Sequence, residues 1–276
     1  MEVPVTEKRK ISLVLADVDG TLVTEEKVLT KRAQSAVRAL QRAGVRFAIT
    51  SGRPPRGMAM LLDPLRLDTP IAGFNGGLFV APDLTILEQK TLPYDVAAKS
   101  IEMMRANGLD AWVYRGNDWL ITRADAPHVA REAWTVKFDP TIVADVGKNL
   151  DHVAKIVGVS DDLDKVQRCE AAAQTAFGNR ATATRSQPYY LDVTHKDANK
   201  GAVVEFLSRH LNVSTGEIAT IGDQPNDVLM FKRSGFSIAM GNASDQVKSQ
   251  ASATTDTYND EGFAKAMERF ILEPVA

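Results

Sequence analysis

Two aspartates separated by one residue stand directly after an apolar run near the start of the chain. Residues 17–22 read DVDGTL and contain Asp17 and Asp19, and the run before them is Ile11–Ala16. Two carboxylates at this spacing can share one hard cation, with oxygen ligands from side chain and backbone. Aspartate and glycine are also common in turns. Alone, the segment fits a metal or catalytic site and an ordinary turn about equally well.

A hydroxyl group and a glycine follow a second apolar run. Ser51, Gly52 and Arg53 come after Val45–Thr50 and before Pro54–Leu65, a segment expected to be helical. The first N–H groups of a helix have no partners within the helix, so a helix start beside a hydroxyl can bind an anion. For this segment alone, a capping serine and a turn glycine are the simpler interpretation.

A second acidic segment and one lysine lie in the last third of the chain. Residues 222–227 read GDQPND, and Asp223, Asn226 and Asp227 could complete an oxygen-only cation site, although the same residues are expected in a turn. Lys200 lies in the first turn of an expected helix, Asn199–Leu211, where a cation opposes the helix macrodipole. That position indicates a role such as neutralising a phosphate, although a surface lysine is the default.

The elements that carry these segments alternate between strands and helices. Apolar runs typical of buried strands precede the acidic and hydroxyl segments, and helices such as Thr30–Ala43, with Thr30 as N-cap, separate them. This alternation indicates βαβ units and a parallel sheet, where ligands bind beyond the carboxyl ends of the strands. The functional groups are therefore expected to meet at one edge of the sheet. The expected strands are Ile11–Ala16, Val45–Thr50, Ile71–Phe74, Glu217–Ile221 and Phe236–Met240.

The middle of the chain has a different pattern. Helices there are interleaved with strand-like pairs, and Leu109–Tyr114 and Asp118–Thr122 flank a hairpin signal. The predicted fold class is α/β, a doubly wound (Rossmann-like) parallel sheet with an inserted α+β cap. Residues 1–86 and 189–276 are predicted to form the parallel-sheet core domain, and residues 87–188 a second domain that is inserted in it and sits over it.

The composition limits which binding partners and which cellular compartment are expected. The chain has 276 residues, with 33 Lys and Arg against 35 Asp and Glu, so neither sign of charge favours a nucleic-acid or membrane partner. Cys169 is the only cysteine, which excludes an intrachain disulfide and favours a reducing compartment. The apolar run 11–16, after a short charged N-terminus, is too brief for a signal peptide or a membrane span. We expect a soluble cytoplasmic protein, and its oligomeric state does not follow from the sequence.

In order along the chain, these segments resemble the four motifs of the haloacid dehalogenase superfamily. They are DVDGTL at 17–22, ITSGR at 49–53, the lysine of NKG at 199–201 and GDQPND at 222–227. The long insertion between the second and third is similar to the cap of the superfamily's Cof-type (subclass IIB) phosphatases, and so are Phe74–Gly77 and Asn259–Gly262. The resemblance covers essentially the whole chain. It implies that residues 1–86 and 189–276 form the catalytic core domain and that residues 87–188 form the cap, which sets substrate specificity.

The resemblance implies a covalent mechanism. Asp17 would match the nucleophile that forms an aspartyl-phosphate. Asp19 would match the general acid that protonates the leaving oxygen and then activates water. An aspartate at position 19 favours hydrolase or mutase chemistry, because the ATP-driven pumps of the superfamily have threonine there and its dehalogenases lack the second aspartate.

The resemblance also implies how phosphate and metal are held. Ser51 and Lys200, with the amide of Gly52, would bind the phosphoryl oxygens, and Asn226 would line the substrate site. Mg²⁺ would bind Asp17, the backbone carbonyl of Asp19, and Asp223. Asp227 would support these ligands from behind rather than bind the metal.

The expected function is that of a Mg²⁺-dependent phosphohydrolase acting on a small phosphorylated metabolite, with a sugar phosphate as the expected substrate. The alternative is a phosphomutase or phosphotransferase of the same superfamily, which passes the phosphoryl group to a sugar hydroxyl. A non-catalytic binding protein would be expected to lose at least one of Asp17, Asp19 and Asp223. The physiological substrate, its pathway and regulation, the cap residues that select it, and the roles of His195 and Asn75 do not follow from the sequence.

Overall fold

The computed structural model describes residues 10–272, and contacts between residues divide the chain into two units. The first unit comprises Met1–Thr50, Leu61–Pro70 and Lys200–Ala276, and the second comprises Ser51–Met60 and Ile71–Asn199. Contacts thus group residues 51–60, 71–86 and 189–199 with the second unit, and the boundaries of a catalytic core and an inserted cap remain a prediction. The charged segment 1–9, considered above for a signal sequence, lies outside the described residues.

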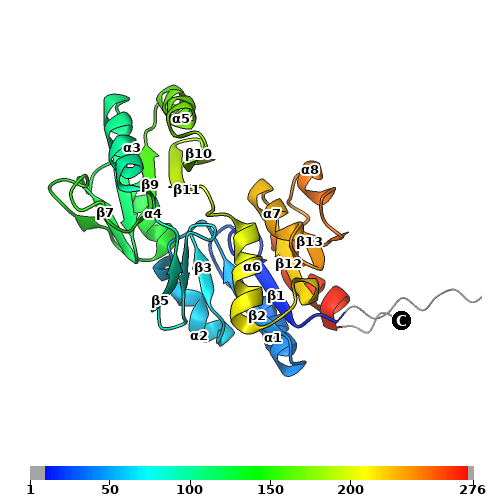
Figure 1. Cartoon of the computed structure of the whole chain (residues 1–276). Helices are drawn as coiled ribbons and strands as arrows, with labels where there is room; N and C mark the ends of the chain where they lie inside the picture. The colour runs from blue at the N-terminus through cyan, green and yellow to red at the C-terminus, as the bar shows by residue number, and fades with distance from the viewer. Residues whose placement is uncertain (1–9, 273–276) are drawn as a thin grey trace, which may run out of the picture. The chain divides into compact units, whose positions relative to one another are not determined.

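A parallel sheet forms the centre of the first unit (Figure 1). Its strands lie in the order β14-β13-β12-β1-β2, and every neighbouring pair is parallel. The central strand β1 pairs with β12 on one side and β2 on the other, and all five of its residues are buried, as its continuous apolar run predicts. The strands are β1 Leu13–Asp17, β2 Arg46–Thr50, β12 Ile218–Gly222, β13 Phe236–Ala239 and β14 Ala253–Thr254.

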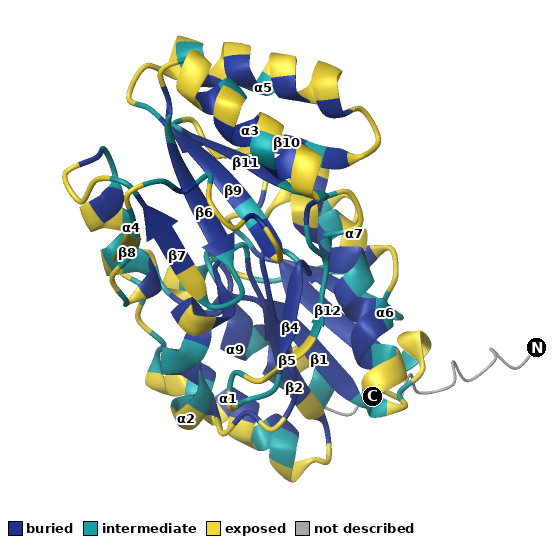
Figure 2. Ribbon diagram, turned by 60° about the vertical axis from the view of Figure 1, so that its left-hand side comes forward, coloured by how far each residue is buried: buried dark blue, intermediate teal, exposed yellow. Residues whose placement is uncertain are grey.

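Helices cover both faces of this sheet. Helices α1 and α9 contact each other, as do α6 and α7, and Figure 2 shows these two pairs on opposite sides of the strands. Helix α1 begins where predicted, because the Thr30 side chain accepts a hydrogen bond from the Ala33 N–H at 3.0 Å. The doubly wound arrangement predicted for the core is therefore confirmed. The helices are α1 Lys31–Arg42, α2 Leu62–Leu65, α6 Lys200–Leu211, α7 Val228–Phe231, α8 Asp245–Lys248 and α9 Gly262–Ala266.

One predicted helix is shorter and tighter than expected. The segment Pro54–Leu65 is a 3₁₀ helix over Pro55–Leu61 followed by the single turn of α2. Its prolines lack the N–H groups that a continuous α-helix would use, so a long helix does not form. At the other end of the chain, α9 stops at Ala266 and is followed by a wider, π-helical segment, Met267–Leu272.

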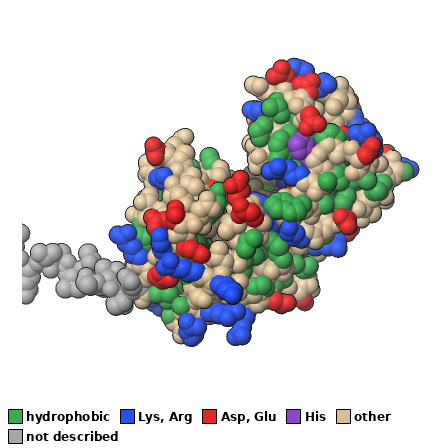
Figure 3. Space-filling view, turned by 180° about the vertical axis from the view of Figure 1, so that it is seen from behind, with side chains coloured by type: hydrophobic (Ala, Val, Ile, Leu, Met, Phe, Trp, Pro, Cys, Tyr) green, Lys and Arg blue, Asp and Glu red, His purple; other side chains and the backbone are tan. Residues whose placement is uncertain are grey.

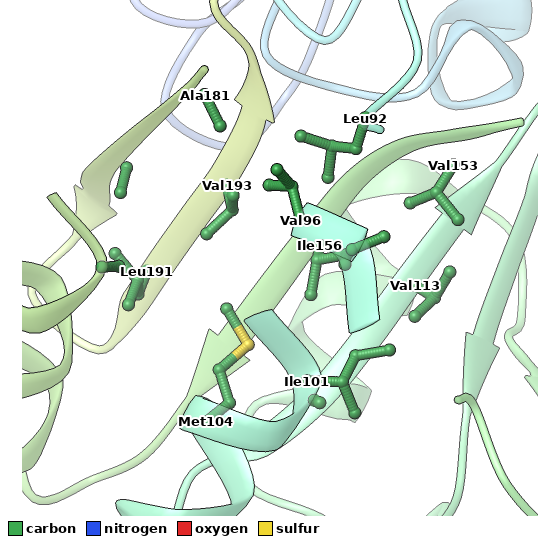
Figure 4. Close-up of a cluster of buried hydrophobic side chains, with 14 of the residues drawn as sticks. Leu92, Val96, Ile101, Met104, Val113, Val153, Ile156, Ala181, Leu191 and Val193 are labelled. Carbon is green, nitrogen blue, oxygen red and sulfur yellow. The ribbon is translucent and has the colours of Figure 1, made fainter. Parts of the chain in front are cut away.

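The second unit contains a six-stranded sheet in the order β10-β11-β9-β6-β7-β8. Its pairs are antiparallel except β7 with β8, and β6 and β7 form the hairpin predicted around Gly116 and Asn117. Helices α3 and α5 contact each other and pack on this sheet. Figure 4 shows their apolar contact, in which Val96 and Met104 of α3 face Ile156 and Val193 of the sheet. The elements are β6 Asp110–Arg115, β7 Asp118–Ile121, β8 Thr141–Ile142, β9 Val153–Val159, β10 Ala181–Gln187, β11 Tyr190–His195, α3 Tyr94–Ala106, α4 Val129–Val136 and α5 Leu163–Phe177.

A short antiparallel meander accounts for the remaining strands of the second unit. Strands β3 (Ile71–Gly73), β4 (Leu78–Val80) and β5 (Ile86–Gln89) pair in that order. The predicted third strand, Ile71–Phe74, is therefore present, but it pairs antiparallel with β4. Asn75 takes a left-handed backbone conformation (φ 56°) in the turn between them. The Asn-Gly-Gly segment therefore forms the turn of a β-hairpin.

Charged side chains of both signs lie intermixed on the face of the molecule shown in Figure 3. This agrees with the near balance of 33 basic and 35 acidic residues. Among residues 10–272, no helix combines the length and the apolar character needed to cross a bilayer.

Candidate active site

The first aspartate ends a buried strand. Asp17 is the last residue of β1, its Cα partner on β2 is Thr50, and it is 4% exposed. Its Oδ1 accepts a hydrogen bond from Lys200 Nζ at 2.5 Å. Because apolar residues precede it and parallel strands flank it, the sheet fixes the direction in which this carboxylate points.

A tight turn brings the second aspartate out of the strand. The Val18 carbonyl accepts hydrogen bonds from the N–H groups of Leu22 and Val23, at 3.0 and 3.1 Å. Gly20 has φ +82°, and a Cβ there would lie 2.6 Å from Asp223 Oδ2, so only glycine fits. Asp19, within this turn, has Oδ1 2.7 Å from Lys27 Nζ.

The third aspartate follows the neighbouring strand. Asp223 comes directly after β12 and is 4% exposed. Its Oδ1 accepts a hydrogen bond from the Thr21 hydroxyl at 3.2 Å. Its Oδ2 accepts from Gln224 Nε2 at 2.6 Å and from Asn242 Nδ2 at 3.2 Å. The carboxyl ends of β1 and β12 thus meet at one edge of the sheet, as predicted.

Asp227 is fully buried and uses both carboxylate oxygens for internal contacts. Its Oδ2 accepts the backbone N–H groups of Asp223 and Gln224 at 2.9 and 2.8 Å, and its Oδ1 accepts from Lys200 Nζ at 2.5 Å. A Cβ on Gly222 would lie 2.4 Å from Asp227 Cγ, so the strand end also requires glycine. Asp227 therefore fixes both the acidic loop and the lysine.

Three carboxylates and one ammonium make up the centre of this site. Asp17, Asp223 and Asp227 each offer an oxygen within 4.8 Å of the others, and Lys200 contacts two of the three. With every group ionised, the net charge of the four is −2. Carboxylate oxygens are the donors that hard divalent cations prefer, so the donor set fits Mg²⁺.

Burial and mutual repulsion shape the ionisation of these groups. Burial raises the pKa of Asp17 well above its usual range, and Asp227 and Asp223 raise it further against the lowering effect of Lys200. Burial, followed by the charge of Asp227, raises the pKa of Asp223 to about 6. Burial alone would lower the pKa of Lys200, but Asp17 and Asp227 outweigh it and raise this pKa. The lysine is therefore a permanent cation in the cluster.

The predicted phosphate-binding residues Ser51 and Gly52 belong to the second unit. Ser51 is 2% exposed, its N–H donates to the Ala72 carbonyl at 3.1 Å, and its Oγ accepts from the Arg53 N–H at 3.1 Å. A Cβ on Gly52 would lie 3.6 Å from the Asn75 amide. This segment opens a 3₁₀ helix rather than the predicted α-helix, so the expected α-helical N-terminus is absent from this part of the described chain.

Two residues whose roles the sequence left open, His195 and Asn75, have local contacts. His195 ends β11, and its Nδ1 accepts the Asp197 N–H at 3.1 Å. The Asn75 N–H donates to the Ser51 carbonyl at 2.8 Å, which ties the hairpin turn to the hydroxyl segment. Asn226, predicted to line the site, lies exposed in the 3₁₀ turn Pro225–Asp227, and its role in substrate binding stays a prediction.

Sequence reasoning missed Lys27 and Asn242. Asn242 follows β13, a third strand that ends at the same edge of the sheet, and it bonds both the Gly20 carbonyl and Asp223. The rule used for the other segments applies to it and would have found it. Lys27 lies in a charged loop with left-handed backbone (φ 63°), and nothing in its spacing separates it from a surface lysine.

These features define a class of protein. The chain belongs to the haloacid dehalogenase-like hydrolase family, whose model matches residues 14–267. The resemblance inferred from the four motifs is therefore confirmed.

Individual relatives agree with that class. The chain is 26% identical over 262 residues to the 5-amino-6-(5-phospho-D-ribitylamino)uracil phosphatase of Bacillus subtilis, covering 95% of this chain and 96% of the relative. A haloacid dehalogenase-like hydrolase from Bacteroides thetaiotaomicron is 29% identical with a TM-score of 0.88, over 95% and 100% of the two chains. A sugar phosphatase of subclass IIB shares the fold at 21% identity and a TM-score of 0.80, over 95% and 100%. The predicted enzyme class, a Cof-type phosphatase acting on phosphoric monoesters, is confirmed by this family and its phosphatase members.

Proposed function

We propose that this phosphatase is Mg²⁺-dependent, acts through an aspartyl-phosphate on Asp17, and takes small phosphorylated metabolites, with sugar phosphates as the substrate class. The observation that carries the proposal is the buried cluster of Asp17, Asp223 and Asp227 around Lys200. Three carboxylates compensated by one cation leave a negative site at the end of β1, which suits a divalent ion. The predicted cytoplasmic location is part of this proposal and rests on the single cysteine.

Asp17 is the nucleophile in this proposal. One of its oxygens attacks the phosphorus atom, the phosphorus–oxygen bond to the leaving group breaks, and a phosphoryl group is left on Asp17. Asp19 gives its proton to the leaving oxygen and later takes a proton from the water that attacks the phosphoryl group. That second attack restores the Asp17 carboxylate and releases inorganic phosphate.

The remaining residues are proposed to position the metal and the phosphoryl group and to neutralise the charge of the phosphoryl oxygens. Asp17, the Asp19 carbonyl and Asp223 would hold Mg²⁺, which supplies positive charge against the phosphoryl oxygens. Lys200 adds a fixed cation, and Asp227, already bonded to Lys200 and to two backbone N–H groups, keeps it in place. Ser51 and the Gly52 amide are proposed to bind phosphoryl oxygens. In support, Ser51 directly follows Thr50 in the chain, and Thr50 is the residue of β2 that pairs with Asp17 of β1.

The test is phosphate release from sugar phosphates, nucleotides and p-nitrophenyl phosphate, with Mg²⁺ or with EDTA. Wild type is compared with Asp17→Asn and with Asp125→Asn, an exposed aspartate outside the cluster. Release that requires Mg²⁺, survives in Asp125→Asn and is lost in Asp17→Asn supports the proposal. If sugar phosphates lose their phosphoryl group to an added sugar without release of free phosphate, the enzyme is a phosphotransferase or mutase instead.

A further inference from the structure

The side chain of Asp19 is held by a lysine from the loop that follows its turn. Asp19 Oδ1 lies 2.7 Å from Lys27 Nζ, and the two side chains are 33% and 20% exposed. The backbone of Asp19 is fixed separately, because the Val18 carbonyl accepts the N–H groups of Leu22 and Val23 and because Asp19 forms a β-bridge with Val23. The turn therefore fixes where Asp19 stands, and Lys27 gives its carboxylate a charged contact that fixes where it points.

The loop that carries Lys27 is closed by hydrogen bonds of its own. The Thr24 N–H donates to the Val28 carbonyl, and the Lys27 N–H donates to the Thr24 carbonyl, both at 3.0 Å. The Thr24 hydroxyl also accepts the Val28 N–H at 3.3 Å. The two glutamates at 25–26 are exposed, whereas Lys27, the only basic residue of the range 20–29, is turned back to Asp19.

Stability alone does not explain this arrangement. Lys27 has a left-handed backbone conformation (φ 63°), which costs free energy in a residue that carries a Cβ. Holding a long side chain in one place costs further entropy, and an ion pair that water reaches returns little of it. A strained residue beside a reactive centre indicates a functional constraint. Asp19 lies two residues after Asp17, so its orientation is where such a constraint would act.

We propose that Lys27 is a positioning residue for Asp19, whose carboxyl group it holds in the orientation that delivers a proton to the leaving oxygen. The inference rests on the proposed function. In that step the phosphorus–oxygen bond breaks, its electron pair goes to the leaving oxygen, and the proton moves from Asp19 to the same oxygen. Lys27 neither gains nor loses a proton, and it acts only through Asp19.

Two aryl phosphates with unlike leaving groups test the inference. Phenol needs a proton from Asp19 as it leaves phenyl phosphate, whereas p-nitrophenol leaves readily as an anion. The comparison uses kcat/KM, which covers the steps up to departure of the leaving group and not the later hydrolysis of the aspartyl-phosphate. Lys27→Met removes the ammonium and keeps the length of the side chain. It should lower kcat/KM roughly tenfold for phenyl phosphate and by at most about twofold for p-nitrophenyl phosphate.

A second variant shows whether Lys27 acts through Asp19. In an Asp19→Asn background, where no carboxyl group can give the proton, Lys27→Met should lower kcat/KM for phenyl phosphate by less than about twofold. Lys31→Met, at an exposed lysine that begins α1, is the matched control and should change neither substrate. Equal losses on both aryl phosphates, no loss on either, or the same loss with and without the Asp19 carboxyl group would overturn the inference.

Crystal structures of wild type and of Lys27→Met separate this inference from the proposed function, because they require no turnover. The Asp19 carboxylate should have one orientation beside Lys27 in wild type, and a different orientation or several in the variant. The same single orientation in both proteins would contradict the inference, even if wild type is an active phosphatase. An orientation that depends on Lys27 supports the positioning, even if wild type releases no phosphate and the proposed function fails.

Discussion

The aspartate cluster of the first unit and one face of the six-stranded sheet in the second unit both bury polar groups, but their hydrogen bonding differs. We call this sheet face the polar face, and its polar and aromatic side chains are Trp112, Tyr114, Trp119, Lys155, Tyr190 and Asp192. In the cluster, Lys200 bonds Asp17 and Asp227, and Asp227 also holds two backbone N–H groups. On the polar face, four buried atoms are unpaired within residues 10–272. The cluster is therefore held together by bonds within the protein, whereas the polar face leaves buried polar atoms without such bonds among the described residues.

The largest effect is expected from Asp17→Asn, which tests whether the cluster carries the chemistry. An amide cannot form the aspartyl-phosphate, so phosphate release should fall on the order of 10³-fold or more. The change keeps the size of the side chain, so the variant should still unfold cooperatively. Phosphate release by coupled assay and unfolding by circular dichroism measure the two effects. Activity within tenfold of wild type would exclude Asp17 as nucleophile.

Lys200→Met is expected to damage both stability and activity. It leaves Asp17, Asp223 and Asp227 without their buried cation, which should cost about 3–5 kcal/mol of unfolding free energy. Urea denaturation at pH 7 with EDTA measures that loss. The matched control is Lys265→Met, because Lys265 pairs with Asp256 at the surface, with side chains 41% and 56% exposed, and should cost at most about 1 kcal/mol. Similar losses in both variants would show that the buried lysine does not hold the cluster together.

Asp223→Asn tests how the stability of the aspartate cluster depends on pH and on Mg²⁺. Burial raises the pKa of Asp223 to about 6, so the metal-free folded state binds this proton more tightly than the unfolded chain does. Its contribution is therefore favourable at low pH and is lost as pH rises through about 6. Between pH 5 and 7.5 in EDTA, the unfolding free energy of wild type minus that of the variant should fall by about 1–1.5 kcal/mol.

Thermal unfolding across this pH range, with and without Mg²⁺, checks that expectation. Mg²⁺ should stabilise wild type at pH 7.5 and stabilise Asp223→Asn much less, because one carboxylate ligand is gone. Parallel pH curves for the two proteins in EDTA would contradict the raised pKa of Asp223, and equal stabilisation of both by Mg²⁺ would remove Asp223 from the metal site.

Much of the cluster was predictable from the sequence because each strand end carries its own local signal. Apolar runs placed β1 and β12, so Asp17 at the end of β1 and Asp223 directly after β12 had to meet at one edge of a parallel sheet. The position of Lys200 was suggested by its unfavourable place in a first helical turn. Lys27 was missed because its contact with Asp19 depends on a loop conformation that no periodicity records.

The polar face was far less predictable. Trp112, Lys155 and Asp192 come from three strands, and antiparallel registers that no short motif encodes bring them together. The sequence predicted the hairpin that holds Trp119, but not which side of the sheet α4 covers. Strands β4 and β5 were missed because they are short and the second is half exposed. Local patterns thus located the chemistry, while long-range pairing had to be seen in the structure.

The smallest effect is expected from removing single tyrosine hydroxyls of the polar face, and it compares a bonded hydroxyl with an unbonded one. The Tyr114 hydroxyl is bonded to Glu132 of α4, whereas the Tyr190 hydroxyl is unpaired. Tyr114→Phe should therefore lower the unfolding free energy by about 1–2 kcal/mol, because it leaves Glu132 without its donor. Tyr190→Phe should leave the unfolding free energy of the ligand-free protein unchanged or slightly higher, since no bond is lost. Urea denaturation of both variants without substrate compares two hydroxyl deletions on one sheet face. If Tyr190→Phe destabilises as much as Tyr114→Phe, the Tyr190 hydroxyl has a hydrogen-bond partner in the folded protein.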